Sequence, residues 1–398
     1  MQKKILLLGG SYGQLPAIHE AKKRGYFTIL CDYLADNPGR KLVDKYYNAS
    51  TTDHQKVLEI AQKEKIDAIF SFSSDPASLT VAYVSEILGL KGNSYKSVEI
   101  LSRKDLFRKL QLSNKFITPA FEVFNKDELH EKFDVTLRLP VVVKPVDSSD
   151  TKGVFKVEEK AELLHKAKQS LSYSRSEKII IEEFIDANSG DLHGDAFFLD
   201  GKMIFCMLGD RLFSSLSNPL KPSTELYPGR LPKKWIRNVE KEVSDLVLLS
   251  GFKNGPVNVE VRIDHTGKIY IMEIGPRSGG TLTPQAICYS TGFDMLKASL
   301  DLLLGEPVLV KKKKTKPVIC CALHSNKEGT FKEFSLDHEL KKYIAEQHIY
   351  IRPGEKVKPY SEPGSTIGVN LFLFPNLDEV NKILPDLYQK VQSAIILT

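Results

Sequence analysis

The sequence lacks the features that mark several large protein classes. Its 398 residues include five cysteines and no Cys-x-x-Cys pair, so neither a disulfide framework nor a zinc site is indicated. No apolar run approaches the roughly 18 residues of a membrane-spanning helix. The net charge is only +6, and Lys311 to Lys314 can carry most of it, which argues against a nucleic-acid partner. We therefore expect a cytoplasmic chain with no membrane and no nucleic-acid partner.

A nucleotide-binding signature is also missing. No Gly-x-x-x-x-Gly-Lys-Ser/Thr motif occurs anywhere, which excludes the P-loop enzymes. The glycines of Gly9 to Gly13 follow an apolar run, and Asp32 comes 19 residues after the last of them, close to the dinucleotide-binding fingerprint. Leu8 stands where that fingerprint needs its first glycine. We expect a Rossmann-like domain whose loop faces a small substrate, with a nicotinamide oxidoreductase as an alternative.

The length exceeds what one hydrophobic core usually organises, and three contiguous domains are expected. Residues 1–101 alternate apolar runs with helix signals, as in a parallel sheet covered on both faces. Residues 102–310 have a mixed α+β pattern, and residues 311–398, beyond the lysine run, are typical of a small β-rich domain with a closing helix over 377–395. The predicted fold class is therefore α/β and α+β.

Individual elements of the first domain can be predicted. The expected strands and helices are Ile5–Leu8, Thr28–Cys31, Ala68–Phe72, a helix over 16–24, a helix begun by a capping box over 52–55, and a helix capped by Asp75.

A strand pattern on either side of a polar turn predicts a hairpin that carries two glutamates. We expect Ile263 to pair with Lys268, which fixes the register. In that register Glu260 and Glu273 share one face as diagonal neighbours, and Asn258 lies opposite Glu273. Two carboxylates brought together favour Mg²⁺ or Mn²⁺. Solvated glutamates on a polar strand face are the alternative, and a register shift would separate the pair.

Groups that suit an anion lie near this hairpin. The segment Gly275-Pro276-Arg277-Ser278-Gly279-Gly280 places a guanidinium and flexible backbone amides directly after the second glutamate. Lys104 lies in the first turn of a helix that we expect Ser102 to cap, and Lys144 ends an apolar strand. A lysine at the tip of a buried strand is costly unless an anion meets it. These residues together predict a phosphate site.

In these motifs the sequence resembles the ATP-grasp ligases, in particular the carboxylate-amine group that includes carbamoyl-phosphate-synthase-like proteins. The resemblance covers nearly the whole chain and is most specific at Val259-Glu260-Val261 and over Met272 to Gly280. It implies a Rossmann-like pre-ATP-grasp domain over 1–101, an ATP-grasp core of two α+β lobes over 102–310, and a small C-terminal α+β domain over 311–398.

The resemblance also implies a role for each site residue. ATP would be bound by Lys104, Lys144, Ser148, Ser149, Lys152, Gly153, Glu182, Glu183, Phe184, Ile185 and Asp191. Mg²⁺ or Mn²⁺ would be held by Glu260 and Glu273, Arg277 and Lys144 would be catalytic, and the substrate would meet Arg277, Gly279, Gly280 and Arg211. Gly275 stands where many members have an asparagine ligand, so the number of metal ions is left open.

The implied activity is an ATP-dependent, ADP-forming ligase. A carboxylate would be activated as an acyl phosphate and joined to an amine, so the expected partners are small-molecule acids and amines, which the sequence does not identify. The open alternatives are a carboxylase that uses bicarbonate and a regulatory subunit that binds nucleotide without turnover. A homodimer is neither indicated nor excluded.

Overall fold

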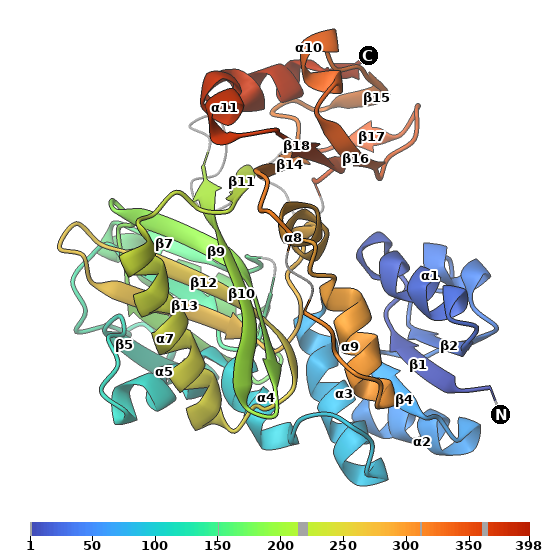
Figure 1. Ribbon diagram of the computed structural model, residues 1–398. Helices are drawn as coiled ribbons and strands as arrows, with labels where there is room; N and C mark the ends of the chain where they lie inside the picture. The colour runs from blue at the N-terminus through green and yellow to red at the C-terminus, as the bar shows by residue number, and fades with distance from the viewer. Residues whose placement is uncertain (1, 150, 214–221, 311–312, 360–364) are drawn as a thin grey trace.

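A computed structural model describes residues 2–149, 151–213, 222–310, 313–359 and 365–398. Figure 1 shows the N-terminal residues in blue, a central body built around a long sheet, and the C-terminal residues in red at the top of the view. The α/β and α+β fold class predicted from the sequence is confirmed.

The N-terminal part contains a parallel four-stranded sheet in the order β3-β2-β1-β4. Ile5 and Leu7 belong to one apolar cluster and Leu6 and Leu8 to another, so both faces of the sheet are covered. The elements are β1 (Lys4–Leu8), α1 (Leu15–Lys23), β2 (Phe27–Asp32), β3 (Lys45–Asn48), α2 (His54–Glu64), β4 (Ala68–Phe70), α3 (Asp75–Leu88) and α4 (Tyr95–Ser102).

The starts of three helices differ from the predictions. The cap of α3 is Ser74, so Asp75 is its first residue, and the cap of α2 is Asp53. Ser102 does not cap α5 (Lys104–Ser113), because it is the last residue of α4 and only the extended Arg103 separates the two helices. The polar strand β3 was not predicted, since it has no apolar run.

The central part is formed by two antiparallel sheets. One has the order β5-β8-β6-β7, and the other is an eight-stranded sheet in the order β13-β12-β9-β10-β11-β14-β18-β16. The bounds are β5 (Phe121–Asn125), β6 (Val141–Pro145), β7 (Phe155–Val157), α6 (Leu163–Leu171), β8 (Lys178–Glu183), β9 (Gly190–Leu199), β10 (Lys202–Leu212), β11 (Thr224–Tyr227), α7 (Lys233–Ser250), β12 (Gly255–Ile263), β13 (Ile269–Gly275), α8 (Thr283–Thr291) and α9 (Met295–Leu304).

The C-terminal part continues the eight-stranded sheet. Its elements are β14 (Val318–Leu323), β15 (Gly329–Phe334), α10 (His338–Lys341), β16 (Ile344–Ile349), β17 (Lys356–Val357), β18 (Gly368–Leu373), α11 (Leu377–Ser393) and β19 (Ile395–Leu397). Strand β14 pairs with β11 of the central part, so one sheet crosses the predicted boundary at 310. Lys311 and Lys312 of the predicted linker lie outside the described residues, and the three domain boundaries stay predictions.

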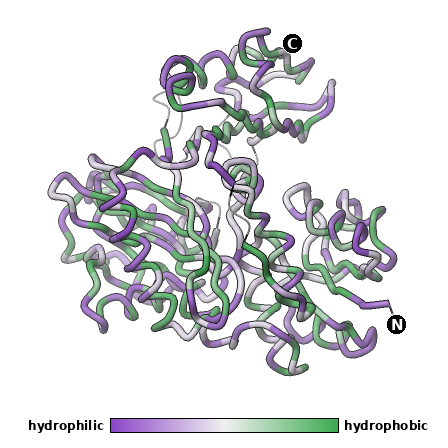
Figure 2. Tube along the Cα trace, in the orientation of Figure 1, coloured by the Kyte–Doolittle hydropathy of each residue, from purple (hydrophilic) through white to green (hydrophobic). Residues whose placement is uncertain are grey.

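The core follows the strands. Figure 2 shows the hydrophobic residues concentrated along the sheets and the hydrophilic ones along the outer helices and loops. Four short 3₁₀ helices, 12–14, 38–42, 126–128 and 160–162, complete the regular structure. Among the described residues, none of the helices has the length and apolar character that crossing a membrane requires.

Candidate functional site

The two glutamates lie directly opposite each other on the hairpin of β12 and β13. The predicted register is wrong, because Ile263 pairs with Ile269, one residue later than expected. Continued without interruption, that pairing would place Glu260 opposite Met272 and turn Glu273 to the other face. A bulge adds one residue to β13 and restores Glu273 to the face of Glu260. The predicted juxtaposition is therefore present, but a bulge produces it.

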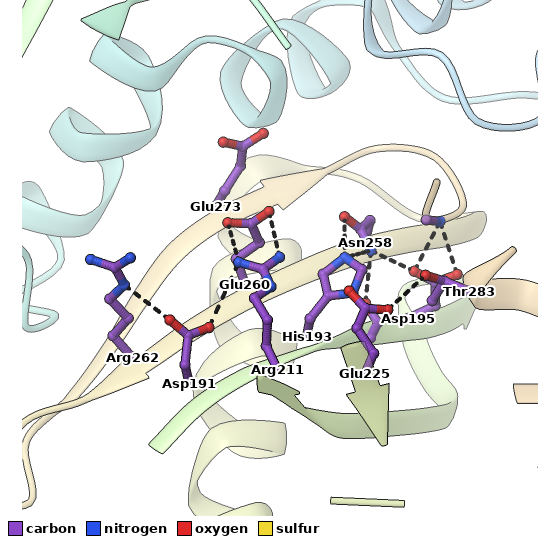
Figure 3. A network of polar contacts seen from close by, with 12 residues as sticks. Asp191, His193, Asp195, Arg211, Glu225, Asn258, Glu260, Arg262, Glu273 and Thr283 are labelled. Carbon is purple, nitrogen blue, oxygen red and sulfur yellow. Dashed lines mark hydrogen bonds and ion pairs between the residues drawn. The ribbon is translucent and has the colours of Figure 1, made fainter. Parts of the chain in front are cut away.

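Arg211 on β10 is the partner of Glu260. Its terminal nitrogens lie 2.8 and 3.1 Å from the two carboxylate oxygens, as Figure 3 shows. Burial alone would raise the pKa of Glu260, but attraction and hydrogen bonding to Arg211 hold it well below its usual value. Arg211 is only 10% exposed and lines the cleft, and its predicted contact with substrate stays a prediction.

Asp191, predicted to bind ATP, lies between two arginines. Its carboxylate is 3.3 Å from Nε of Arg262 and 3.7 Å from Nη1 of Arg211. Burial raises the pKa of Asp191, although the two arginines oppose this. The side chain lines the cleft, and its oxygens already have cationic partners there.

Lys104 connects the glutamate hairpin to the loop after β6. Its Nζ lies 3.3 Å from a carboxylate oxygen of Glu273 and donates to the carbonyl oxygen of Ser148 at 3.0 Å. Burial lowers the pKa of Lys104, but the carboxylates of Glu273, Asp75 and Glu260 together raise it overall. The ammonium group is therefore held charged next to the second glutamate.

Lys144 and Glu182 form a buried ion pair. The Nζ of Lys144 is 2.6 Å from one carboxylate oxygen of Glu182, and Nε of Arg108 is 2.8 Å from the other. Burial would raise the pKa of Glu182, but the two cations lower it to about 2. The resemblance implies that Glu182 binds ATP, and in the structure its carboxylate holds the ammonium group of Lys144.

Arg108 was missed by the sequence analysis, although it is completely buried. All five of its N–H groups have partners: Glu182 twice, Gln111, and the carbonyl oxygens of Ile271 and Met272. The last two bonds hold the bulge that brings the glutamates together. Lys104, Arg108 and Gln111 share one face of α5 at helical spacing, and this buried polar face was the available signal.

A second polar network lies beside the glutamates in Figure 3. His193 Nδ1 is 2.8 Å from Glu225, and the charge of Glu225 raises the pKa of His193 although burial lowers it. Asn258, opposite Gly275 rather than Glu273, donates to Asp195 at 2.8 Å. The side-chain oxygen of Asn258 lies 3.2 Å from Nε2 of His193, so both ends of the amide face groups of the protein.

The loop after β13 is fixed from two sides. The backbone N–H of Gly279 donates to both carboxylate oxygens of Asp195 at 3.0 and 2.9 Å, so this amide is not available to a substrate. The guanidinium of Arg277 is bound by Asp75, the first residue of α3. Sequence reasoning saw Asp75 only as a helix cap.

These residues surround one large cleft of about 770 Å³. Most of the site residues predicted from the sequence line this cleft: Lys104, Lys144, Ser148, Ser149, Lys152, Gly153, Glu182, Glu183, Ile185, Asp191, Arg211, Glu260, Glu273, Arg277 and Gly280. Two predicted residues, Phe184 and Gly279, are not among the described lining residues. Lys156 lies 4.5 Å from the centre of the Phe184 ring.

The glutamate pair suits a hard divalent cation. Both side chains are partly accessible, at 36% for Glu260 and 29% for Glu273, and both line the cleft. Magnesium keeps several waters and commonly binds one or two carboxylates together with phosphate oxygens. No group of three or more His, Cys, Asp or Glu ligands occurs among the described residues, so the two carboxylates would share the ion with oxygens from outside the chain.

In the loop after β1, the residues that resemble a dinucleotide-binding fingerprint make their contacts within the protein. Both carboxylate oxygens of Asp32 accept backbone N–H groups, from Gly10 at 2.7 Å and Leu34 at 2.8 Å. A Cβ on Gly10 would lie 2.0 Å from the side-chain oxygen of Asn37. The glycine here permits close packing within the protein, and Asp32 fixes the loop.

Part of the chain is similar to known proteins. Residues 137–285 match the family model of the ATP-grasp domain. The chain is 31% identical over 212 residues to formate-dependent phosphoribosylglycinamide formyltransferase of Prochlorococcus marinus, covering 51% of this chain and 53% of that protein. It is 30% identical over 210 residues to phosphoribosylamine–glycine ligase of Pyrococcus furiosus, covering 51% and 47%. The match spans about half the length of these curated relatives.

Solved structures share the fold over the whole chain. The L-amino acid ligase of Bacillus licheniformis superimposes with a TM-score of 0.84 at 21% identity, covering 100% of this chain and 99% of that one. The N5-carboxyaminoimidazole ribonucleotide synthetase of Thermotoga maritima gives 0.74 at 17% identity, with full coverage of both chains. At such identities the likeness establishes the fold alone.

Proposed function

Because the chain carries an ATP-grasp domain, we propose that it is an ATP-dependent, ADP-forming carbon–nitrogen ligase that activates a carboxylate as an acyl phosphate. The observation that carries the proposal is the direct opposition of Glu260 and Glu273 in a cleft that also holds Lys104, Lys144 and Arg277. Carboxylates for a divalent ion and cations for phosphate oxygens are what phosphoryl transfer from ATP requires.

ATP would lie in the cleft, with its phosphates towards Lys104 and Lys144. The ion pair with Glu182 fixes the ammonium of Lys144 at 2.6 Å, and Lys104 is held by Glu273 and the Ser148 carbonyl. When bound at Glu260 and Glu273, Mg²⁺ or Mn²⁺ would neutralise charge on the terminal phosphates. Positioning and charge stabilisation supply most of the catalysis in such reactions.

The reaction has two steps. A carboxylate oxygen of the acid attacks the γ-phosphorus, an O–P bond forms, and ADP leaves with the electrons of the broken bond. Arg277 and Lys144 would stabilise the negative charge on the resulting acyl phosphate. The amine then attacks the acyl carbon, the amide C–N bond forms, inorganic phosphate leaves, and the nitrogen loses a proton.

A phosphate-release screen of amino acids in pairs, with bicarbonate included, tests this function. The proposal expects ADP and phosphate only when ATP, an acid and an amine are all present. Release that needs bicarbonate as the acid would favour the carboxylase. Tight ATP binding without release across the whole panel would favour a nucleotide-binding regulatory subunit and overturn the ligase.

The remaining expectations belong to this proposal. The domains would be 1–101, 102–310 and 311–398, and the substrates a small carboxylic acid and an amine. The five cysteines are free, which supports a reducing, cytoplasmic setting. Sedimentation would decide between a monomer and a homodimer.

A further inference from the structure

Asp75 and Arg277 join two parts of the chain that are 202 residues apart in sequence. The Nε and Nη2 of Arg277 donate to the two carboxylate oxygens of Asp75 at 2.7 and 2.6 Å. The side chains are only 13% and 17% exposed, so solvent screens the pair weakly. Such a two-point, charge-assisted contact fixes the plane of the guanidinium as well as its position.

The contact leaves a defined part of Arg277 for a ligand. A guanidinium has five N–H groups, and Asp75 takes one on Nε and one on Nη2. A third, on Nη1, donates to the carbonyl oxygen of Ser278 at 3.0 Å. One N–H on each terminal nitrogen remains, and Arg277 lines the cleft. This pair matches the two oxygens of a carboxylate or phosphate group.

Gly275 makes room for the contact. A Cβ at this position would lie 3.0 Å from a carboxylate oxygen of Asp75 and 3.5 Å from Cζ of Arg277. Asp75 and Arg277 pass close to the backbone of β13 at this position, so a residue without a side chain fits there best. The glycine that stands in place of an asparagine ligand has a steric reason in this chain.

We propose that Asp75 is a positioning residue, which holds Arg277 so that its remaining N–H pair meets the oxygens of the acid substrate and its acyl phosphate. Asp75 also lines the cleft, and its proposed role is exerted through Arg277. Through Asp75, the N-terminal part of the chain would set the position of Arg277 on the loop after β13, where the acid substrate is proposed to bind. The inference rests on the proposed function of the cleft.

A purely structural role for Asp75 as a link between the same parts of the molecule is the competing explanation. A second ion pair between the same parts of the molecule can distinguish the two explanations. Arg24, which follows α1, and Asp301 on α9 also join the N-terminal part to the central part, at 2.5 Å and with 16% and 22% exposure. Neither is among the described residues that line the cleft. Asp301→Asn therefore weakens the link without touching the site.

The test compares the parent, Asp75→Asn and Asp301→Asn with the acid–amine pair that gives phosphate release in the parent. Asp75→Asn is expected to lower kcat/KM for the acid about 10- to 100-fold, with KM for ATP within about twofold. Asp301→Asn should match the parent in both. Equal losses in the two variants, or an unchanged acid kcat/KM in Asp75→Asn, would overturn the proposal.

Crystal structures of the parent and Asp75→Asn give a readout that does not need turnover. Arg277 should keep its place in the parent and leave it in the variant, while the Glu260–Glu273 hairpin is unchanged. An unmoved Arg277 in Asp75→Asn would contradict the positioning role. A parent that shows no turnover with any acid would overturn the proposed function, and the structures would still decide the role of Asp75.

Discussion

Arg211 binds both carboxylate oxygens of Glu260, at 2.8 and 3.1 Å, from the neighbouring part of the same sheet. The guanidinium is almost completely buried and also lies 3.7 Å from Asp191. The carboxylate that we propose as a metal ligand is thus kept ionised and in place by the protein itself.

The first prediction concerns this pair. Arg211→Met should lower the free energy of unfolding by about 2–3 kcal/mol, because Glu260 loses its close cation while Asp191 keeps Arg262. The partial exposure of Glu260 makes the loss smaller than for a fully buried pair. Urea unfolding at neutral pH measures the loss. Arg230→Met is the control, since Arg230 is 42% exposed beside Asp210 and should cost no more than about 1 kcal/mol. Equal losses in the two variants would contradict the buried pairing.

Acid should destabilise the protein steeply. Burial opposes ionisation of Glu182 and Glu225, but their cationic partners lower both pKa values to about 2, from 4.5 for an unperturbed glutamate. A lowered folded-state pKa means that the unfolded chain binds protons first as the pH falls. The stability that these groups provide is therefore present at neutral pH and is lost between about pH 5 and about pH 2.

Unfolding midpoints across this range test the expectation. Glu225→Gln should be less stable than the parent at neutral pH, because His193 loses its anionic partner, and its stability should fall less steeply with acid. Parallel curves for parent and variant would show that Glu225 does not contribute to the acid sensitivity.

Gly275→Ala should have the same effect on kcat/KM for the acid as Asp75→Asn. The added Cβ would press on the Asp75 carboxylate at 3.0 Å, so kcat/KM for the acid should fall about tenfold or more. The double variant Gly275→Ala/Asp75→Asn should be no worse than the poorer single variant, because both changes act on one contact. Steady-state kinetics in the acid substrate measure this, and additive losses would show two independent effects.

Much of the fold was predictable because its elements carry strong local signals. Buried strands such as Ile5–Leu8 are apolar throughout, and α9 has both its cap, Asp294, and its terminator, Gly305. The polar strand β3 has no such signal. The start of α5 was misplaced because Ser102 suits a cap in sequence but is used as the last residue of α4.

The sequence predicted individual residues of the site but not the residues that they contact. Lys104, Lys144 and the two glutamates can be recognised in the sequence. A charged residue at the end of an apolar strand or on a hairpin face is costly unless a group of opposite charge meets it. Their partners are distant in sequence, as in Glu182 with Arg108 or Arg277 with Asp75. The bulge at Met272 could not be predicted either, since long-range bonds from Arg108 hold it.

The most direct test of the ligase is the Glu273→Gln variant. Glu273 is a better choice than Glu260, because its ion-pair partner among the described residues is Lys104 at 3.3 Å, whereas removal of Glu260 would leave Arg211 without its close partner. The measurement is ATP-dependent phosphate release with the active acid–amine pair, across a range of Mg²⁺ concentrations. We expect turnover to fall about 100-fold or more and half-saturation to need more Mg²⁺, with an unchanged unfolding midpoint. Turnover equal to that of the parent at every Mg²⁺ concentration would contradict the metal-binding role of the glutamate pair and the function built on it.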